Sequence, residues 1–91
     1  MSSETAITVR YWAAARAATG VPKEVFEVPG ALTLAELAEL VKQRHGGAQV
    51  ERVVAVCSVL LDEQPVASRE PGQVLVEPGR VVDFLPPFAG G

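Results

Sequence analysis

The sequence predicts an α+β fold, in which a mixed sheet of four to five strands has one main helix packed on one face. Several short segments rich in β-branched and aromatic residues indicate strands, and one longer segment has helical spacing and a capping signal. Pairs of proline and glycine mark turns between these segments. The length of 91 residues suffices for one domain and is too short for two.

The first strand covers Ile7–Trp12, ITVRYW, where apolar and polar residues alternate. Successive side chains of a strand point to opposite faces, so the alternation separates a core face from a second face. The core face carries Ile7, Val9 and Tyr11, and the second face carries Thr8, Arg10 and Trp12.

An alanine-rich segment, Ala13–Thr19, follows the first strand and predicts a short helix. Gly20 would close this helix in a left-handed conformation that glycine adopts without strain. Lys23–Val28 predicts a second strand, which Pro22 and a Pro-Gly turn delimit. The short connection favours antiparallel pairing of these two strands.

The main helix has the clearest local signals. Thr33 and Glu36 form a Thr-x-x-Glu capping box, which satisfies two free N–H groups at the start of a helix. Its apolar stripe, at a spacing of three and four, consists of Leu34, Leu37, Ala38 and Val41. Gly46 ends the helix, and we interpret His45 as a solvated helix terminus, where positive charge suits the helix dipole.

The second half of the chain predicts the remaining strands. Val53–Leu61 shows no alternation, which is typical of a strand covered on both faces or of one whose second face meets a partner. A weaker strand near Val66 follows, and residues 68–77 have room for a helical turn and a short strand around Val74–Val76. Residues 80–85, RVVDFL, form the last strand, which Pro86 ends because proline lacks an N–H.

This order of elements matches a β-grasp, the ubiquitin-like fold, in which the last strand lies parallel to the first. Residues 1–85 would form the β-grasp domain and residues 86–91 a flexible C-terminal tail. Val82 and Phe84 would face the helix, and Arg10 could pair with Asp83 on the other face. Trp12 and Leu85 would be exposed apolar groups near the tail, either a docking surface or a cover for the sheet edge.

Composition excludes several classes of function. A net charge of −3 and a pI near 5.0 argue against a nucleic-acid partner, which basic clusters recognise. The longest apolar stretch is far shorter than the about 20 residues that span a bilayer, so we expect no membrane partner. One cysteine and the absence of a signal-peptide pattern indicate a cytoplasmic location.

The usual chemistry of a catalytic or metal site is missing from the sequence. His45 and Cys57 are its only histidine and cysteine, and nothing in the pattern brings them together. We interpret Cys57 as a small buried apolar residue in the middle of a strand. The sequence contains no phosphate-binding glycine loop and no cluster with metal-ligand spacing, so we expect no metal site and no bound cofactor.

The unusual feature is the end of the sequence, PPFAGG. The α-carboxylate of Gly91 becomes a useful electrophile only if ATP converts it to an acyl-adenylate, from which a sulfur or amine nucleophile displaces AMP. Two glycines without Cβ atoms can pass through a narrow channel, and two prolines keep the backbone extended. Six extended residues reach roughly 20 Å, enough to enter the active site of another protein.

Three segments, VRYWAAARAATG, TLAELAELV and VVDFLPPFAGG, resemble the MoaD/ThiS sulfur-carrier family over nearly the whole chain. The resemblance implies a carrier that acts as the small subunit of molybdopterin synthase and is not catalytic alone. An E1-like, MoeB-like enzyme would use ATP to adenylate the terminal glycine, and a sulfurtransferase would supply sulfur to form a thiocarboxylate. A MoaE-like large subunit would then receive the tail for molybdenum cofactor biosynthesis.

The resemblance also assigns roles to residues. Gly91 would carry the acyl-adenylate and then the thiocarboxylate, and Gly90, Ala89 and Phe88 would thread the partner's channel. The base of the tail and its partner contacts would be formed by Pro87, Pro86, Leu85, Phe84, Trp12 and Arg16.

Three other functions stay open at this point. The resemblance extends to carriers with the same terminus that donate sulfur for thiamine or cysteine biosynthesis. The fold and the Gly-Gly end also suit a ubiquitin-like modifier, in which Gly91 would be joined to lysines of target proteins. The chain could also be an interaction module that uses the open sheet face around Trp12 and not the tail.

Overall fold

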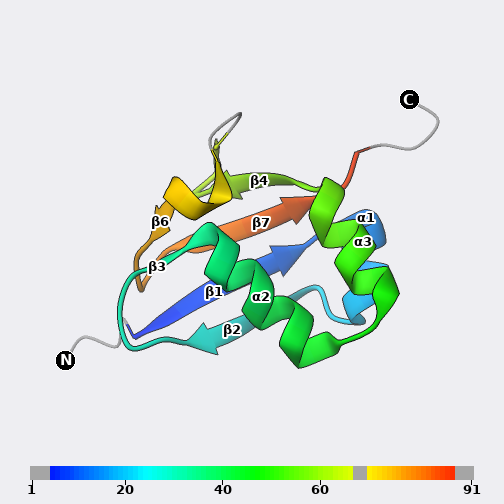
Figure 1. Ribbon diagram of the computed structural model, residues 1–91, viewed down its shortest axis with the longest axis horizontal. Helices are drawn as coiled ribbons and strands as arrows, with labels where there is room; N and C mark the ends of the chain where they lie inside the picture. The colour runs from blue at the N-terminus through cyan, green and yellow to red at the C-terminus, as the bar shows by residue number, and fades with distance from the viewer. Residues whose placement is uncertain (1–4, 67–69, 88–91) are drawn as a thin grey trace.

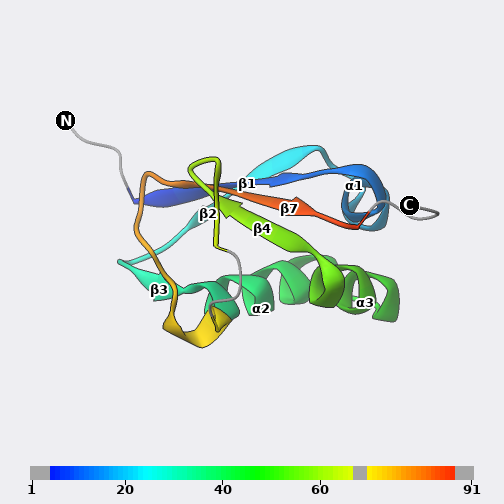
Figure 2. The same ribbon diagram turned by 90° about the horizontal axis from the view of Figure 1, so that it is seen from above.

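The computed structural model describes residues 5–66 and 70–87 of the chain and has a two-layer arrangement (Figures 1 and 2). One layer is a five-stranded mixed sheet in the order β2-β1-β7-β4-β5. Its strands are β1 (Ala6–Tyr11), β2 (Lys23–Glu27), β4 (Ser58–Leu61), β5 (Gln64–Pro65) and β7 (Val81–Leu85). A separate pair consists of β3 (Leu32–Thr33) and β6 (Leu75–Val76).

The chain also forms helices, two of which make the second layer. Within the described residues they are α1 (Ala13–Thr19), α2 (Leu34–His45), α3 (Ala48–Val56) and the short 3-10 helix η1 (Pro71–Gln73). Both α2 and α3 lie on one side of the sheet, and α1 lies at the end of the sheet where β7 finishes (Figure 2). None of the described helices covers the opposite side of the sheet, which we call the open face (Figure 2).

The centre of the sheet is the parallel pair of β1 and β7. Antiparallel strands flank it, β2 beside β1 and β4 beside β7. The first and last strands of the chain are therefore neighbours, and a crossover that carries the helices connects them. This arrangement confirms the predicted β-grasp fold and the predicted direction of the last strand.

The core lies between the sheet and α2 and follows the predicted alternation. Ile7 and Val9 on β1 are 0% exposed, and Tyr11 is 2% exposed. Val82 and Phe84 on β7 are equally buried, as are the helix residues Leu34, Leu37 and Val41. Burial of each such side chain contributes about 1.5–3 kcal/mol, so this stripe holds the two layers together.

The predicted helix signals are also confirmed. The Thr33 hydroxyl accepts a hydrogen bond from the Glu36 N–H at 3.0 Å, and the Thr33 N–H donates to Glu36 Oε1 at 2.8 Å. Gly20 ends α1 with a φ of 83°, and its N–H donates to the Arg16 carbonyl at 2.8 Å. The local sequence therefore fixes both helix boundaries.

The expectation that Val53–Leu61 is one strand is wrong over its first part. Residues 48–56 form α3, and the strand begins at Ser58. Val50 and Val54 lie four residues apart and are buried, while Val56 is 60% exposed. Several valines lie close together here, so the sequence fits a buried strand as well as a helix. Packing of Val50 and Val54 against the core favours the helix despite the β-propensity of valine.

Cys57 and His45 also differ from their predicted settings. Cys57 lies between α3 and β4 and is partly buried, and burial raises the pKa of its thiol to about 11.

His45 is held against β2, and only 14% of its side chain is exposed. Its Nε2 lies 2.5 Å from Glu24 Oε2, and its ring packs edge-on against the ring of Tyr11. Glu24 also accepts from the Tyr11 hydroxyl, so the end of α2 is tied to the sheet.

We expect Leu37→Ala to lower the free energy of unfolding by about 2–5 kcal/mol, because it leaves a cavity at a fully buried position. Urea unfolding followed by circular dichroism measures this change. Leu75→Ala, at a position that is 60% exposed, is the matched control and should change stability by less than about 0.5 kcal/mol. Similar losses in both variants would contradict the proposed core.

Candidate functional site at the base of the tail

The chain leaves the domain at the end of β7, where Leu85 is followed by two prolines. Pro86 is buried and Pro87 is exposed, so the backbone is held by the domain up to Pro86. Neither proline can donate a ladder hydrogen bond, which explains why the strand stops here. Phe88, Ala89, Gly90 and Gly91 lie outside the described residues, and their roles stay predictions.

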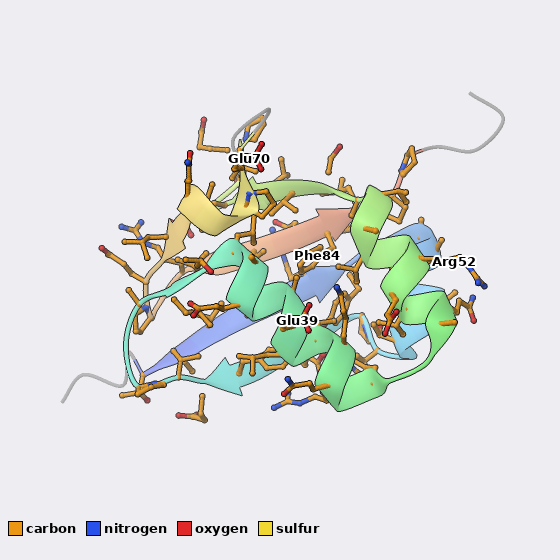
Figure 3. All side chains as sticks on the ribbon, viewed as in Figure 1. Glu39, Arg52, Glu70 and Phe84 are labelled. Carbon is orange, nitrogen blue, oxygen red and sulfur yellow. The ribbon has the colours of Figure 1, made fainter. Side chains whose placement is uncertain are left out.

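Phe84 supports this base from inside the domain. It is 1% exposed and lies on the side of the sheet that the helices cover (Figure 3), where its ring stacks on Tyr11 with centroids 6.1 Å apart. The backbone carbonyl of Phe84 accepts a hydrogen bond from the backbone N–H of Trp12 at 3.2 Å. The structure thus brings together Trp12, Phe84, Leu85 and Pro86 from the two ends of the sequence.

The open face carries the predicted pair of Arg10 and Asp83. Their Cα atoms are partners in the parallel ladder, so both side chains point the same way. Arg10 Nε donates to Asp83 Oδ1 at 2.6 Å, and Arg10 Nη2 donates to Oδ2 at 2.9 Å. Trp12 Nε1 donates to the same Oδ1 at 2.9 Å.

Asp83 is buried although it belongs to the open face. Only 1% of it is exposed, because Arg10 and Trp12 cover it. Burial by itself would raise the pKa of Asp83, but the hydrogen bonds from Arg10 and Trp12 and the charge of Arg10 outweigh this effect, so the pKa lies below its usual range. The carboxylate is therefore ionised at neutral pH.

A hollow of about 430 Å³ lies on the open face beside the base of the tail. Its lining residues are Arg10, Trp12, Leu60, Glu63, Asp83 and Leu85. Trp12 is 49% exposed, as predicted, and Leu85 is partly exposed. Leu60 and Glu63 were missed by sequence reasoning, although the β-grasp places the strand of Leu60 beside β7 and the ladder pairs Leu60 with Asp83.

Arg16 lies on α1, at the same end of the molecule as the base of the tail (Figure 1). It is exposed and makes no ion pair within residues 5–66 and 70–87. Its predicted contact with a partner stays a prediction.

Within residues 5–66 and 70–87, no three side chains of histidine, cysteine, aspartate or glutamate come close enough to hold a metal ion. None of the helices in these residues is long and apolar enough to cross a membrane.

The fold and this site define a ubiquitin-like β-grasp protein whose C-terminal tail starts from the central strand of the sheet. A sequence model of the ThiS family matches residues 9–91. A curated relative from Aspergillus niger, named molybdopterin synthase sulfur carrier subunit, is 31% identical over 91 residues, covering 100% of both chains. The chain therefore belongs to the ThiS family, the MoaD/ThiS sulfur carriers that its sequence resembles.

Solved structures agree on the fold. Molybdopterin converting factor subunit 1 from Pyrococcus furiosus has a TM-score of 0.75 and 24% identity, and the match covers 92% of this chain and 99% of that chain. SAMP1 from Haloferax volcanii has a TM-score of 0.77, 18% identity and coverage of 94% and 99%. A complex of subunits 1 and 2 of the molybdopterin-converting factor from Helicobacter pylori matches with a TM-score of 0.64, 17% identity and coverage of 94% and 99%.

We expect Asp83→Asn to lower the free energy of unfolding at pH 7 by about 1–3 kcal/mol, because Arg10 loses a charged acceptor. The folded pKa of Asp83 lies below its unfolded value of about 3.9, so its ionised form stabilises the fold above that pH. As the pH falls through the folded pKa, the difference between the two proteins should disappear. Urea unfolding between pH 7 and pH 2 tests this, and a difference that is independent of pH would contradict it.

Proposed function

We propose that this protein is the small subunit of molybdopterin synthase and carries sulfur as a thiocarboxylate on the C-terminal Gly91. The observation that carries the proposal is the tail that starts at the buried Pro86, directly after the central strand β7. A folded base followed by a short sequence that ends in two glycines suits a carrier that presents one reactive group inside other proteins. The name of the Aspergillus niger relative, a sulfur carrier subunit that matches over its full length, supports the same role.

The chemistry of loading requires two steps. An E1-like activating enzyme joins the Gly91 carboxylate to AMP and releases pyrophosphate from ATP. In the second step, the persulfide of a sulfurtransferase displaces AMP and forms an acyl disulfide. A thiol of the donor then reduces the S–S bond and is itself oxidised to a disulfide, which releases the thiocarboxylate with one sulfur in place of one carboxylate oxygen. The single cysteine of the chain, Cys57, is partly buried and its thiol has a raised pKa, so the sulfur nucleophile would come from the donor.

Delivery requires a partner with the catalytic site. The Helicobacter pylori structure, a complex of subunits 1 and 2 of the molybdopterin-converting factor, supports a large-subunit partner for this chain. We propose that the tail enters this subunit and that Gly91 gives its sulfur to a pyranopterin precursor for molybdenum cofactor biosynthesis. Trp12, Leu85, Pro86 and Pro87, at the base of the tail, would contact the partner, as would Arg16.

Incubation of the full chain with ATP, an E1-like activator and a sulfurtransferase with its sulfur source tests the loading step. Mass spectrometry of the intact protein should show the exchange of one oxygen for one sulfur, located in the C-terminal peptide. A chain without Gly90 and Gly91 is the control and should stay unmodified. An unchanged mass of the full chain would refute the proposed role.

A ubiquitin-like protein modifier is the second candidate function. The similarity in fold to SAMP1, a small archaeal modifier protein by name, favours this candidate. In that case Gly91 would form amide bonds with lysines of other proteins. Expression of a tagged chain in its native host should then give conjugates of higher mass that vanish when Gly91 is deleted, and their absence would favour the sulfur carrier.

The same loading chemistry would serve a carrier for thiamine or cysteine biosynthesis. Such a carrier would form the thiocarboxylate but would not assemble with the large subunit of molybdopterin synthase. Size-exclusion chromatography of the loaded chain with that subunit separates these possibilities.

A further inference from the structure

The indole of Trp12 is held in one orientation although half of it is exposed. Trp12 follows β1 and is the N-cap residue of α1, with an extended backbone. An exposed aromatic side chain at such a position can ordinarily change rotamer. Here its Nε1 donates a hydrogen bond of 2.9 Å to Asp83 Oδ1, which selects one rotamer.

Asp83 cannot turn away from this contact. Both of its oxygens accept hydrogen bonds from Arg10, and the carboxylate is 1% exposed. A buried ion pair often contributes no more to stability than well-packed apolar residues of similar size. The pair with Arg10 is therefore weak evidence that stability is the only role of this carboxylate, which also accepts the hydrogen bond from the indole.

The oriented indole forms a wall of the hollow beside the base of the tail. Leu60 and Leu85 form the other apolar walls, and Leu85 is the last residue of β7. A protein that takes up the tail must approach this hollow, because the chain leaves the domain next to it. Glu63, with 76% of its side chain exposed, lies 3.7 Å from Arg10 Nη2, and the same guanidinium is paired with Asp83. Two carboxylates therefore share one positive charge, which leaves an excess negative charge at the rim.

We propose that Asp83 is a positioning residue for docking, which holds the Trp12 indole as a preformed wall that receives an apolar side chain of the tail-accepting subunit. A basic side chain of that subunit beside Glu63 would complete the contact. This inference rests on the proposed function in molybdopterin synthase. A wall that is ordered before binding saves the entropy of fixing one side chain, which corresponds to about a threefold to tenfold tighter complex.

The test measures the affinity of the full chain for the large subunit of molybdopterin synthase by isothermal titration calorimetry. Asp83→Leu, which removes the acceptor for the indole, should weaken binding about threefold to tenfold. Asp83→Asn keeps an oxygen acceptor and should bind within about twofold of the natural chain, although its stability falls. Leu75→Ala, which shortens an exposed apolar side chain on β6, is the control and should bind normally.

A double-mutant cycle separates positioning from a general structural effect. Trp12→Phe keeps an aromatic wall but has no N–H to donate, so it should weaken binding about as much as Asp83→Leu. The double variant should then bind no more weakly than Trp12→Phe alone. Full additivity of the two changes would overturn the proposal, because Asp83 would then act by another route.

Trp12 is the only tryptophan of the chain, so its indole N–H gives one assignable nuclear magnetic resonance signal. Exchange of this proton with solvent should be slow in the natural chain and in Asp83→Asn, and faster in Asp83→Leu. Normal affinity of Asp83→Leu together with faster exchange would overturn the proposal. If Asp83→Leu does not fold, Trp12→Phe decides, and binding equal to that of the natural chain would overturn it.

Binding of the natural chain to the large subunit tests the proposed function, and the differences among the variants test the role of Asp83. A natural chain that binds the large subunit while all variants bind equally well supports the function and refutes the role of Asp83. A natural chain that does not bind the large subunit refutes both.

Discussion

The parallel pairing of β1 with β7 is the constraint on which the rest of the structure depends. It joins the first and last strands of the chain in one register, with Val9 beside Val82 and Arg10 beside Asp83. One face of this pair supplies the centre of the core, and the other face supplies the ion pair. Because the two strands run in the same direction, β7 ends where α1 begins, so the base of the tail lies next to Trp12.

The two faces of this pair stabilise the protein in different ways. The face toward α2 is aliphatic and aromatic, and its contribution scales with the apolar area removed from water. The open face has a charged pair, of which the loss of one partner is destabilising although the pair as a whole often contributes no more than apolar residues of similar size. An exposed aromatic ring that is fixed by a buried carboxylate is a surface prepared for contact, in agreement with the proposed docking of a partner at the base of the tail.

The sequence allowed most of this arrangement to be predicted, because its signals are local or follow from strand alternation. The faces of the first strand, the capping box at Thr33 and the pair of Arg10 with Asp83 belong to this group. The helix α3 could not be separated from the strand that follows, since a run of valines satisfies both patterns. His45 and Leu60 depend on contacts across the fold, with Glu24 and Asp83 respectively, which no spacing in the sequence reveals.

The central position of β7 has a mechanical consequence. A force that draws the tail into another protein acts along β7, which is bonded to β1 on one side and to β4 on the other. Hydrogen bonds on both sides lie across this direction and share the load in shear, whereas an edge strand pulled sideways would lose its bonds one after another. The central position of β7 should therefore make the domain resistant to unfolding when the tail is pulled along the strand direction.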